Sequence, residues 1–132
     1  MNVHFMSKTD EWETPIETFL KLHTEFNFTV DVCATPKNRK LGKYYTREED
    51  GLSKDWGGEF VWMNPPYGRT IGKWVEKLSQ NKGVGLLPAR TDTKWFHDFI
   101  YGKAEIRFLK GRLKFGGGKN SAPFPSMVVV FK

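Results

Sequence analysis

The sequence predicts an α/β protein with one compact domain over residues 1–132 and a mostly parallel sheet that ends in an antiparallel strand pair. First, strand patterns alternate with helix patterns along the chain, the arrangement that builds parallel sheets. Second, the runs "VGLL" and "MVVVF" are apolar on both faces, as in strands covered on both sides. Third, no helix pattern joins the last two strands, so they should pair antiparallel. A chain of 132 residues fits one domain.

The first third of the chain predicts one helix and one strand. In "TPIETFLKLHTEF", Thr14 can cap the helix, Pro15 suits its first position and Glu17 completes a capping box. One helix face would carry Ile16, Phe19, Leu20, His23 and Phe26. The strand "FTVDVC" follows at 28–33, and residues 34–58 are irregular. A short extended piece is expected there at Tyr44 and Tyr45.

The rest of the chain predicts two helices and five strands. A strand at 60–63 runs into the loop "NPPY" and a helix over 71–80. The strand "GVGLLP" at 83–88 precedes a short aromatic helix around "TKWFHDFI". Strands are then expected at "EIRFL", at "RLKF" and, after a glycine-rich link, at "MVVVF".

Three distant segments should converge on one cleft. Ligands of an open α/β sheet bind beyond the carboxyl ends of its strands. Such ends are expected at Asp31 with Cys33 and Ala34, at 64–67 and at 88–93.

Composition limits the classes of protein and partner. The net charge of +6 fits a polyanionic partner such as nucleic acid, although a plain basic surface is an alternative. A single cysteine excludes an intramolecular disulfide, and the three histidines have no ligand spacing, so we predict no metal site. No run approaches the ~18 apolar residues of a membrane span, and the start lacks a secretory layout. We expect a cytoplasmic protein.

The stretch "VWMNPPYG" has a chemical interpretation. Its prolines end a strand and leave a rigid loop. The exocyclic amine of adenine or cytosine is a poor nucleophile, because its lone pair is delocalised into the ring. Two acceptors, the Asn64 amide oxygen and the Pro65 carbonyl, would pull the nitrogen toward tetrahedral geometry. Pro66 stiffens the loop, and Tyr67 could stack on a base taken out of the helix.

The whole chain resembles the small phage and prophage DNA adenine-N6 methyltransferase family. The resemblance runs through "DEWETP", "FTVDVCAT", "KYYTREEDGLSKDW", "VWMNPPYG", "LLPARTDTKWFH", "IRFLKGRLKF" and "APFPSMVVVF". It implies a Rossmann-like methyltransferase fold without a separate target-recognition domain. It also implies methyl transfer from S-adenosylmethionine to adenine N6 in DNA, most simply double-stranded, in the cytoplasm of a bacterial host.

The resemblance also implies where the cofactor binds. Trp12, Thr14 and Pro15 would wrap over its methionine part, while Asp31 would lie near the methionine amino group or its bound water. Asp50 would accept from the adenine amine. Cys33 and Ala34 follow Asp31 in the turn "DVCATPKN", which departs from the usual Gly-x-Gly, and Asn38 is a candidate for the ribose. The alternatives are a helix start at Thr14 and a solvated turn at Asp50.

The resemblance also implies which residues contact the DNA substrate. Arg90 would meet a phosphate, Trp95 would line the base entrance and Phe124 would pack on the base beside Tyr67. Trp95 could equally be core, and Phe124 could simply close a hairpin. Basic loops would contact mostly phosphate, giving short sequence specificity and strong salt dependence.

Rival functions remain at this point. The same acceptors would serve N4-cytosine or RNA adenine methylation. The missing glycines would suit a catalytically weak or inert nucleic-acid-binding module of the same fold. A homodimer or an accessory partner is also open.

Overall fold

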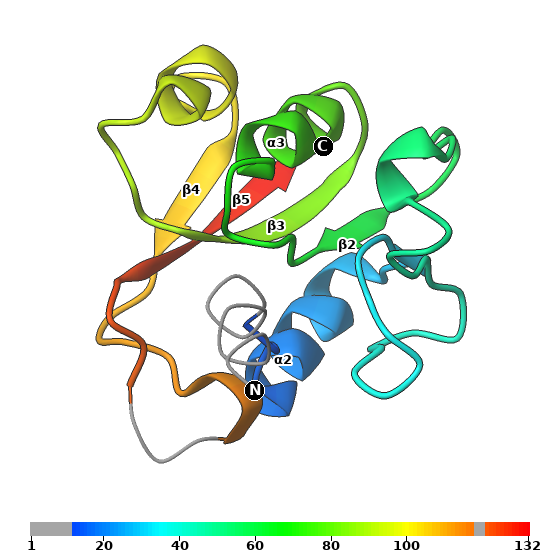
Figure 1. Ribbon diagram of the computed structural model, residues 1–132. Coiled ribbons are helices and arrows are strands. Elements are labelled where there is room, and N and C mark those ends of the chain that lie inside the picture. The colour runs from blue at the N-terminus through cyan, green and yellow to red at the C-terminus, as the bar shows by residue number, and fades with distance from the viewer. Residues whose placement is uncertain (1–11, 118–120) are drawn as a thin grey trace.

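The computed structural model describes residues 12–117 and 121–132 and contains one five-stranded sheet (Figure 1). The strand order is β1-β2-β3-β5-β4. The strands are β1 (Val30–Asp31), β2 (Val61–Met63), β3 (Gly83–Pro88), β4 (Glu105–Phe108) and β5 (Ser126–Phe131). The pairs β1–β2 and β2–β3 are parallel, whereas β5 is antiparallel to both β3 and β4. Since only β5 is reversed, the mixed sheet is parallel in its first strands. The final strand is antiparallel as expected, but it pairs with β4 and not with the predicted strand "RLKF".

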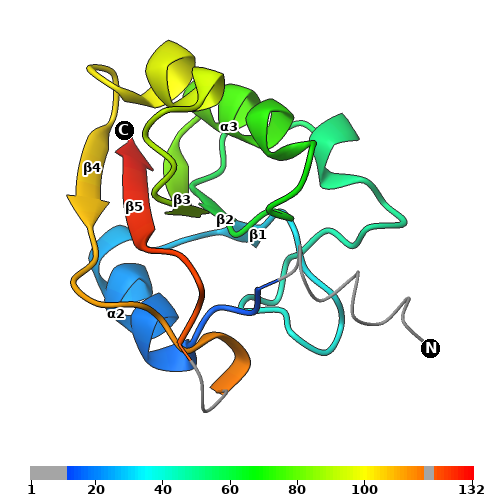
Figure 2. The ribbon, with the colours of Figure 1, turned by 60° about the vertical axis from the view of Figure 1, so that its left-hand side comes forward.

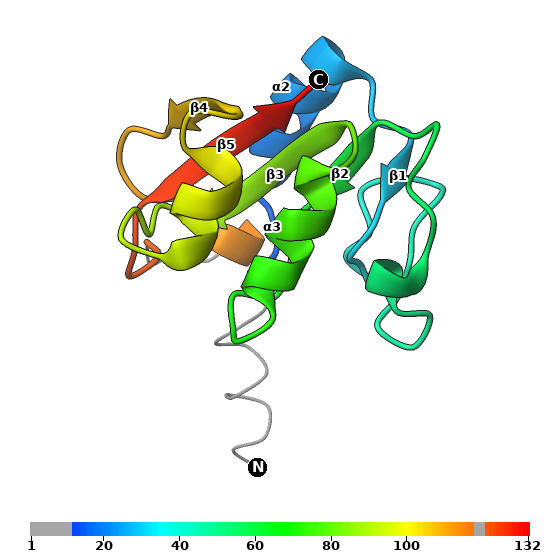
Figure 3. The same ribbon diagram turned by 90° about the horizontal axis from the view of Figure 1, so that it is seen from above.

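Helices cover both faces of the sheet. Helix α2 (Ile16–Phe26) packs on one face, and α3 (Ile71–Ser79) with the short helix η2 (Phe96–Ile100) packs on the other (Figure 3). Alternate residues of β2 show the division, because Trp62 faces the α2 cluster while Val61 and Met63 face the α3 cluster. This two-sided burial explains why "GVGLLP" and "SMVVVF" are buried at every position.

The start of α2 differs from the prediction. Its N-cap is Pro15 and no side chain caps it, so the predicted Thr14 capping box does not form. The buried residues of the helix are Phe19 and Leu22, whereas Ile16 and Leu20 are each 51% exposed. The predicted apolar face was therefore wrong in part, because the helix is rotated to pack Phe19 against Trp62 at a ring distance of 5.3 Å.

Two other predicted elements also changed. The segment "RLKF" is not a strand, because 112–114 are irregular and Phe115 begins the short helix η3 (Phe115–Gly117). Strand β1 is shorter than 28–33, although backbone bonds from Thr29 to Phe60 and from Val32 to Trp62 continue its ladder. The extended piece at Tyr44 is confirmed as a parallel bridge to Asp31.

The reversed direction of β5 determines what lies at the carboxyl edge of the sheet. Ser126, its first residue, pairs with Pro88, the last residue of β3, and Ala89 donates to the Pro125 carbonyl. The loop that precedes β5 therefore lies beside the loops that follow β1, β2 and β3 (Figure 2). In the described ranges no helix is long and apolar enough to cross a membrane.

Candidate active site

The Asn64 side chain is held from one side by the segment that precedes α2. Its Nδ2 donates to the Thr14 hydroxyl oxygen at 2.8 Å and also to the Trp12 carbonyl. A backbone carbonyl can only accept, so the nitrogen of the amide must face Trp12. Thr14 is buried, and its side chain serves Asn64 instead of capping the helix.

The opposite atom of the same amide has no protein partner. Asn64 Oδ1 is buried and accepts no hydrogen bond from any described residue. A buried acceptor without a partner costs about 1–3 kcal/mol, and native structures contain few of them. The site therefore presents an oriented acceptor that a ligand N–H can satisfy.

Trp12, whose carbonyl accepts from this amide, belongs to an aromatic cluster with Tyr67 and two phenylalanines. Tyr67 is 3% exposed and donates its hydroxyl to the Leu86 carbonyl at 2.8 Å. Its ring meets Phe115 and Phe124 edge-on, with centroids 6.3 and 5.6 Å away. Trp12 contacts the same two phenylalanines at 5.6 and 5.1 Å. Burial raises the pKa of the Tyr67 hydroxyl far above its ordinary value, so Tyr67 is a neutral donor.

Backbone bonds join three of the segments that carry this cluster, namely the one before α2, the one around η3 and the loop before β5. Gly116 donates to the Glu13 carbonyl at 2.8 Å, and Ala122 donates to the Leu113 carbonyl at 2.8 Å. The segment around η3 consequently lies against the chain that leads into α2 (Figures 1 and 2). Residues far apart in sequence thus form one wall of the site.

Asp31 is a buried carboxylate at the end of β1. It is 2% exposed, and its two oxygens accept from the backbone N–H groups of Lys40 at 3.0 Å and Cys33 at 3.3 Å. Desolvation raises its pKa to about 6, and these two bonds oppose the rise. Asp31 therefore fixes the loop after β1 and remains mostly ionised at neutral pH.

Asp50 is exposed and lies next to the end of β1. Its backbone has φ 55°, and its carboxylate accepts from Leu52 N–H at 3.3 Å at the start of the short helix η1 (Gly51–Ser53). A Cβ on Gly51 would lie 2.1 Å from the Val32 carbonyl oxygen, so only glycine allows this approach. This close contact holds η1 against the chain that follows β1. Ala34 is buried, and Cys33 is half-buried.

The remaining predicted residues divide between the site and its support. Arg90 is exposed, and its guanidinium donates to the Tyr67 carbonyl at 3.4 Å, so it lies beside the Asn-Pro-Pro-Tyr loop. Trp95 is half-buried and packs on the core near Gly72. Asn38 closes a turn by accepting from Thr35 N–H at 2.7 Å. Pro65 is buried, whereas Pro66 is half-buried.

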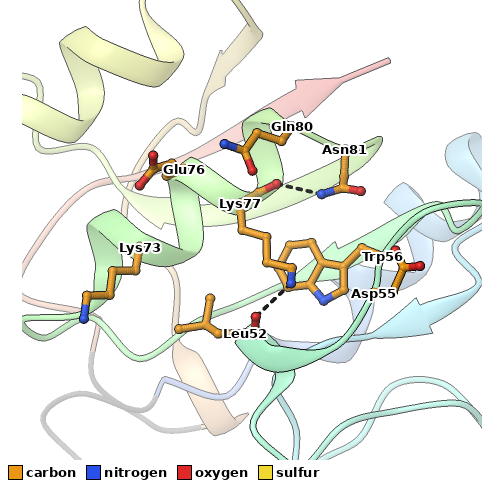
Figure 4. Close-up of a pocket in the computed structure, with 8 residues that line it drawn as sticks. All are labelled: Leu52, Asp55, Trp56, Lys73, Glu76, Lys77, Gln80 and Asn81. Atoms are coloured by element: carbon orange, nitrogen blue, oxygen red, sulfur yellow. Dashed lines mark hydrogen bonds between the residues drawn. The ribbon is translucent and has the colours of Figure 1, made fainter.

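A pocket of about 430 Å³ on the α3 face has a structural explanation (Figure 4). The Lys77 ammonium crosses it, donates to the carbonyls of Leu52 and Lys54 and lies 5.0 Å from the centre of the Trp56 ring. These bonds attach η1 to α3. Since α3 leads away from the Asn-Pro-Pro-Tyr loop toward the start of β3, this pocket is directed away from Asn64.

Sequence reasoning missed Phe115 and the Thr14–Asn64 bond. The sequence pattern predicts a strand at Phe115, whereas the Phe115 ring contacts Trp12, Tyr67 and Phe124. A weak signal was available, because "KFGGG" combines an aromatic residue with glycines that are poor strand formers. No local pattern marks the bond between Thr14 and Asn64, which are separated by 50 positions.

An α/β sheet with an Asn-Pro-Pro-Tyr loop at its carboxyl edge is typical of methyltransferases that act on planar amino nitrogens. The comparisons identify the family more narrowly. The family model described as DNA N-6-adenine-methyltransferase (Dam) matches residues 4–132, so the chain belongs to that family.

Curated relatives agree with this membership. The chain is 33% identical over 139 residues to the DNA N-6-adenine-methyltransferase of Haemophilus phage HP1, with 96% of this chain and 80% of the relative covered. It is 33% identical over 110 residues to the DNA N-6-adenine-methyltransferase of Escherichia phage T1, with 79% of this chain but only 46% of that relative covered. A putative methyltransferase of Escherichia coli K12 is 34% identical over 65 residues, with 44% of this chain and 71% of the relative covered.

Proposed function

We propose that this chain transfers a methyl group from S-adenosylmethionine to the N6 amine of adenine in DNA, within a bacterial host cell. Family membership and the names of the two phage relatives support the reaction class. The observation that carries the proposal is the buried, unpaired Asn64 Oδ1, oriented by two bonds to its own nitrogen.

The adenine amine would satisfy this acceptor. One N–H of N6 donates to Asn64 Oδ1, and the other donates to the Pro65 carbonyl, which draws the nitrogen lone pair out of the ring. When bound, S-adenosylmethionine supplies an electrophilic methyl group. An amide and a carbonyl accept hydrogen bonds but take no full proton, so the proton of the methylated amine leaves to solvent.

Residues at the carboxyl edge fit the cofactor. Asp31 is a buried anion whose two bound N–H groups leave further lone pairs, so it can accept from an ammonium group. Such a cation would bring its pKa back down. Asp50 is exposed beside the same strand end and offers an acceptor for the adenine amine of the cofactor. Trp12, Thr14 and Pro15 would lie over the methionine part.

The target base must reach the aromatic cluster. Tyr67 is covered by Phe115 and Phe124, so a base can stack on its ring only after Phe124 shifts. Phe124 lies in the loop before β5 and is half-buried, which suits a side chain that moves. Arg90 would then meet the backbone of the extruded nucleotide, and Trp95 would support the entrance.

Nucleoside mass spectrometry tests the proposal. Duplex DNA and, separately, RNA are incubated with S-adenosylmethionine and the wild type, Asn64→Ala or the control Asn81→Ala. Asn81 also carries an amide that donates to a carbonyl, but at the α3 end. We expect N6-methyladenine in DNA with the wild type and the control, and its loss with Asn64→Ala. Methylated cytosine or methylated RNA alone would overturn the substrate assignment, and no methylated nucleoside from folded protein would favour a binding module.

A further inference from the structure

A second cavity, of about 560 Å³, lies between the start of α2 and the segment that carries η3. We propose that it binds the nucleotide of DNA next to the target adenine and reads its base. This inference rests on the proposed function and extends it to sequence specificity.

The position of the cavity supports this assignment. Thr14 lines it, and the same Thr14 hydroxyl accepts from Asn64 Nδ2. A group in the cavity and a base at Asn64 are therefore separated by one side chain. The polynucleotide that delivers the target base also brings the nucleotides on either side of it close to this region.

The charges of its two walls fit a nucleotide better than a phosphate alone. Arg112 and Lys114 line one wall, are exposed and form no ion pair with any described residue. Glu17 lines the other wall and is also without an ion pair among the described residues. Cations bind a phosphate, whereas a carboxylate repels it and instead accepts from an exocyclic base amine.

Apolar groups complete the cavity. Ile16 is 51% exposed at its wall, and Leu113 and Pro15 also line it. An exposed isoleucine at a helix start gains contact when the flat face of a base covers it. Lys40 and Glu13 close one side of the cavity. The Lys40 ammonium lies 3.6 Å from a Glu13 carboxylate oxygen, and this ion pair forms part of the wall.

The first test measures DNA affinity against salt for Arg112→Ala/Lys114→Ala and for the control Lys73→Ala/Lys82→Ala. Both double variants remove two exposed positive charges, but the control charges lie outside this cavity. We expect the magnitude of the log–log slope to fall by about 1.8 for the cavity variant only, since each phosphate contact contributes about 0.9. Equal effects of the two variants would overturn the phosphate contact.

The second test reads the base preference. Unmethylated plasmid DNA is treated with the wild type, Glu17→Gln or the helix control Glu76→Gln, and N6-methyladenine positions are read by single-molecule sequencing. We expect a preference for one base beside the methylated adenine, weakened by about fivefold or more in Glu17→Gln alone. A preference unchanged in Glu17→Gln, or absent in the wild type, would refute base reading.

The tests distinguish a failure of the proposed methyl transfer from a failure of the proposed nucleotide binding in the cavity. The salt titration needs no methyl transfer, so the cavity can be confirmed as a DNA site in a protein that proves inactive. Conversely, active protein with no cavity effect would refute this inference alone. All substituted side chains are exposed, and thermal melting checks that each variant is folded.

Discussion

Thr14→Val distinguishes two roles of the Thr14 hydroxyl, namely anchoring of Asn64 and contact with the cofactor. Valine has nearly the shape of threonine but cannot accept from Asn64 Nδ2, which would keep only its bond to the Trp12 carbonyl. A hydrogen bond of this kind contributes about 1 kcal/mol. If that energy orients Oδ1 in the transition state, kcat should fall about fivefold. Thr14→Ser keeps the hydroxyl and serves as the matched control.

The assay is the initial rate of adenine methylation at several concentrations of S-adenosylmethionine, with melting temperature as a check on folding. We expect a lower kcat and an unchanged KM for the cofactor in Thr14→Val, and a kcat close to wild type in Thr14→Ser. A wild-type kcat in Thr14→Val would refute the anchoring role. A change confined to KM would instead assign the hydroxyl to the cofactor.

Three further predictions concern stability. Tyr67→Phe leaves the buried Leu86 carbonyl unpaired and should lower the free energy of unfolding by about 1–2 kcal/mol in urea titrations, with methylation retained because the ring remains. Burial raises the pKa of Asp31 to about 6, so between pH 4 and pH 6 the folded protein holds a proton that the unfolded chain has lost. The free energy of unfolding should therefore fall as pH rises through this range, by up to about 3 kcal/mol more in the wild type than in Asp31→Asn. A wild-type free energy of unfolding that rises with pH relative to Asp31→Asn would contradict the raised pKa. Gly51→Ala should lower the free energy of unfolding by about 3 kcal/mol because its Cβ would overlap the Val32 carbonyl, and an unchanged free energy would disprove that contact.

Elements with a long, regular apolar pattern were predictable from the sequence. The helix over 71–80 and the strand "GVGLLP" appear nearly as expected, because burial on both sides of the sheet requires continuous apolar residues. The convergence of loops after β1, β2 and β3 was also predictable, since it follows from parallel pairing alone.

Features that depend on distant partners were not predictable. Thr14 has the sequence environment of a cap, and only the folded chain shows its hydroxyl beside Asn64. The alternation in "RLKF" favours a strand, but the aromatic contacts of Phe115 and the left-handed turn at Gly116 decide otherwise. On α2, several rotations satisfy the apolar spacing, and packing of Phe19 against Trp62 selects one of them.

The place of β5 between β3 and β4 has a consequence for how the protein folds. Strand β4 precedes β5 in the chain but pairs only with β5 among the described strands, so it can join the sheet only through β5. Docking of β5 also brings in Phe124, which covers Tyr67. Contacts between such distant segments close slowly. The contact of Phe124 with Tyr67, which completes the aromatic cluster, should therefore be among the last to form, and a ribosome-bound chain that lacks β5 should have no methylation activity.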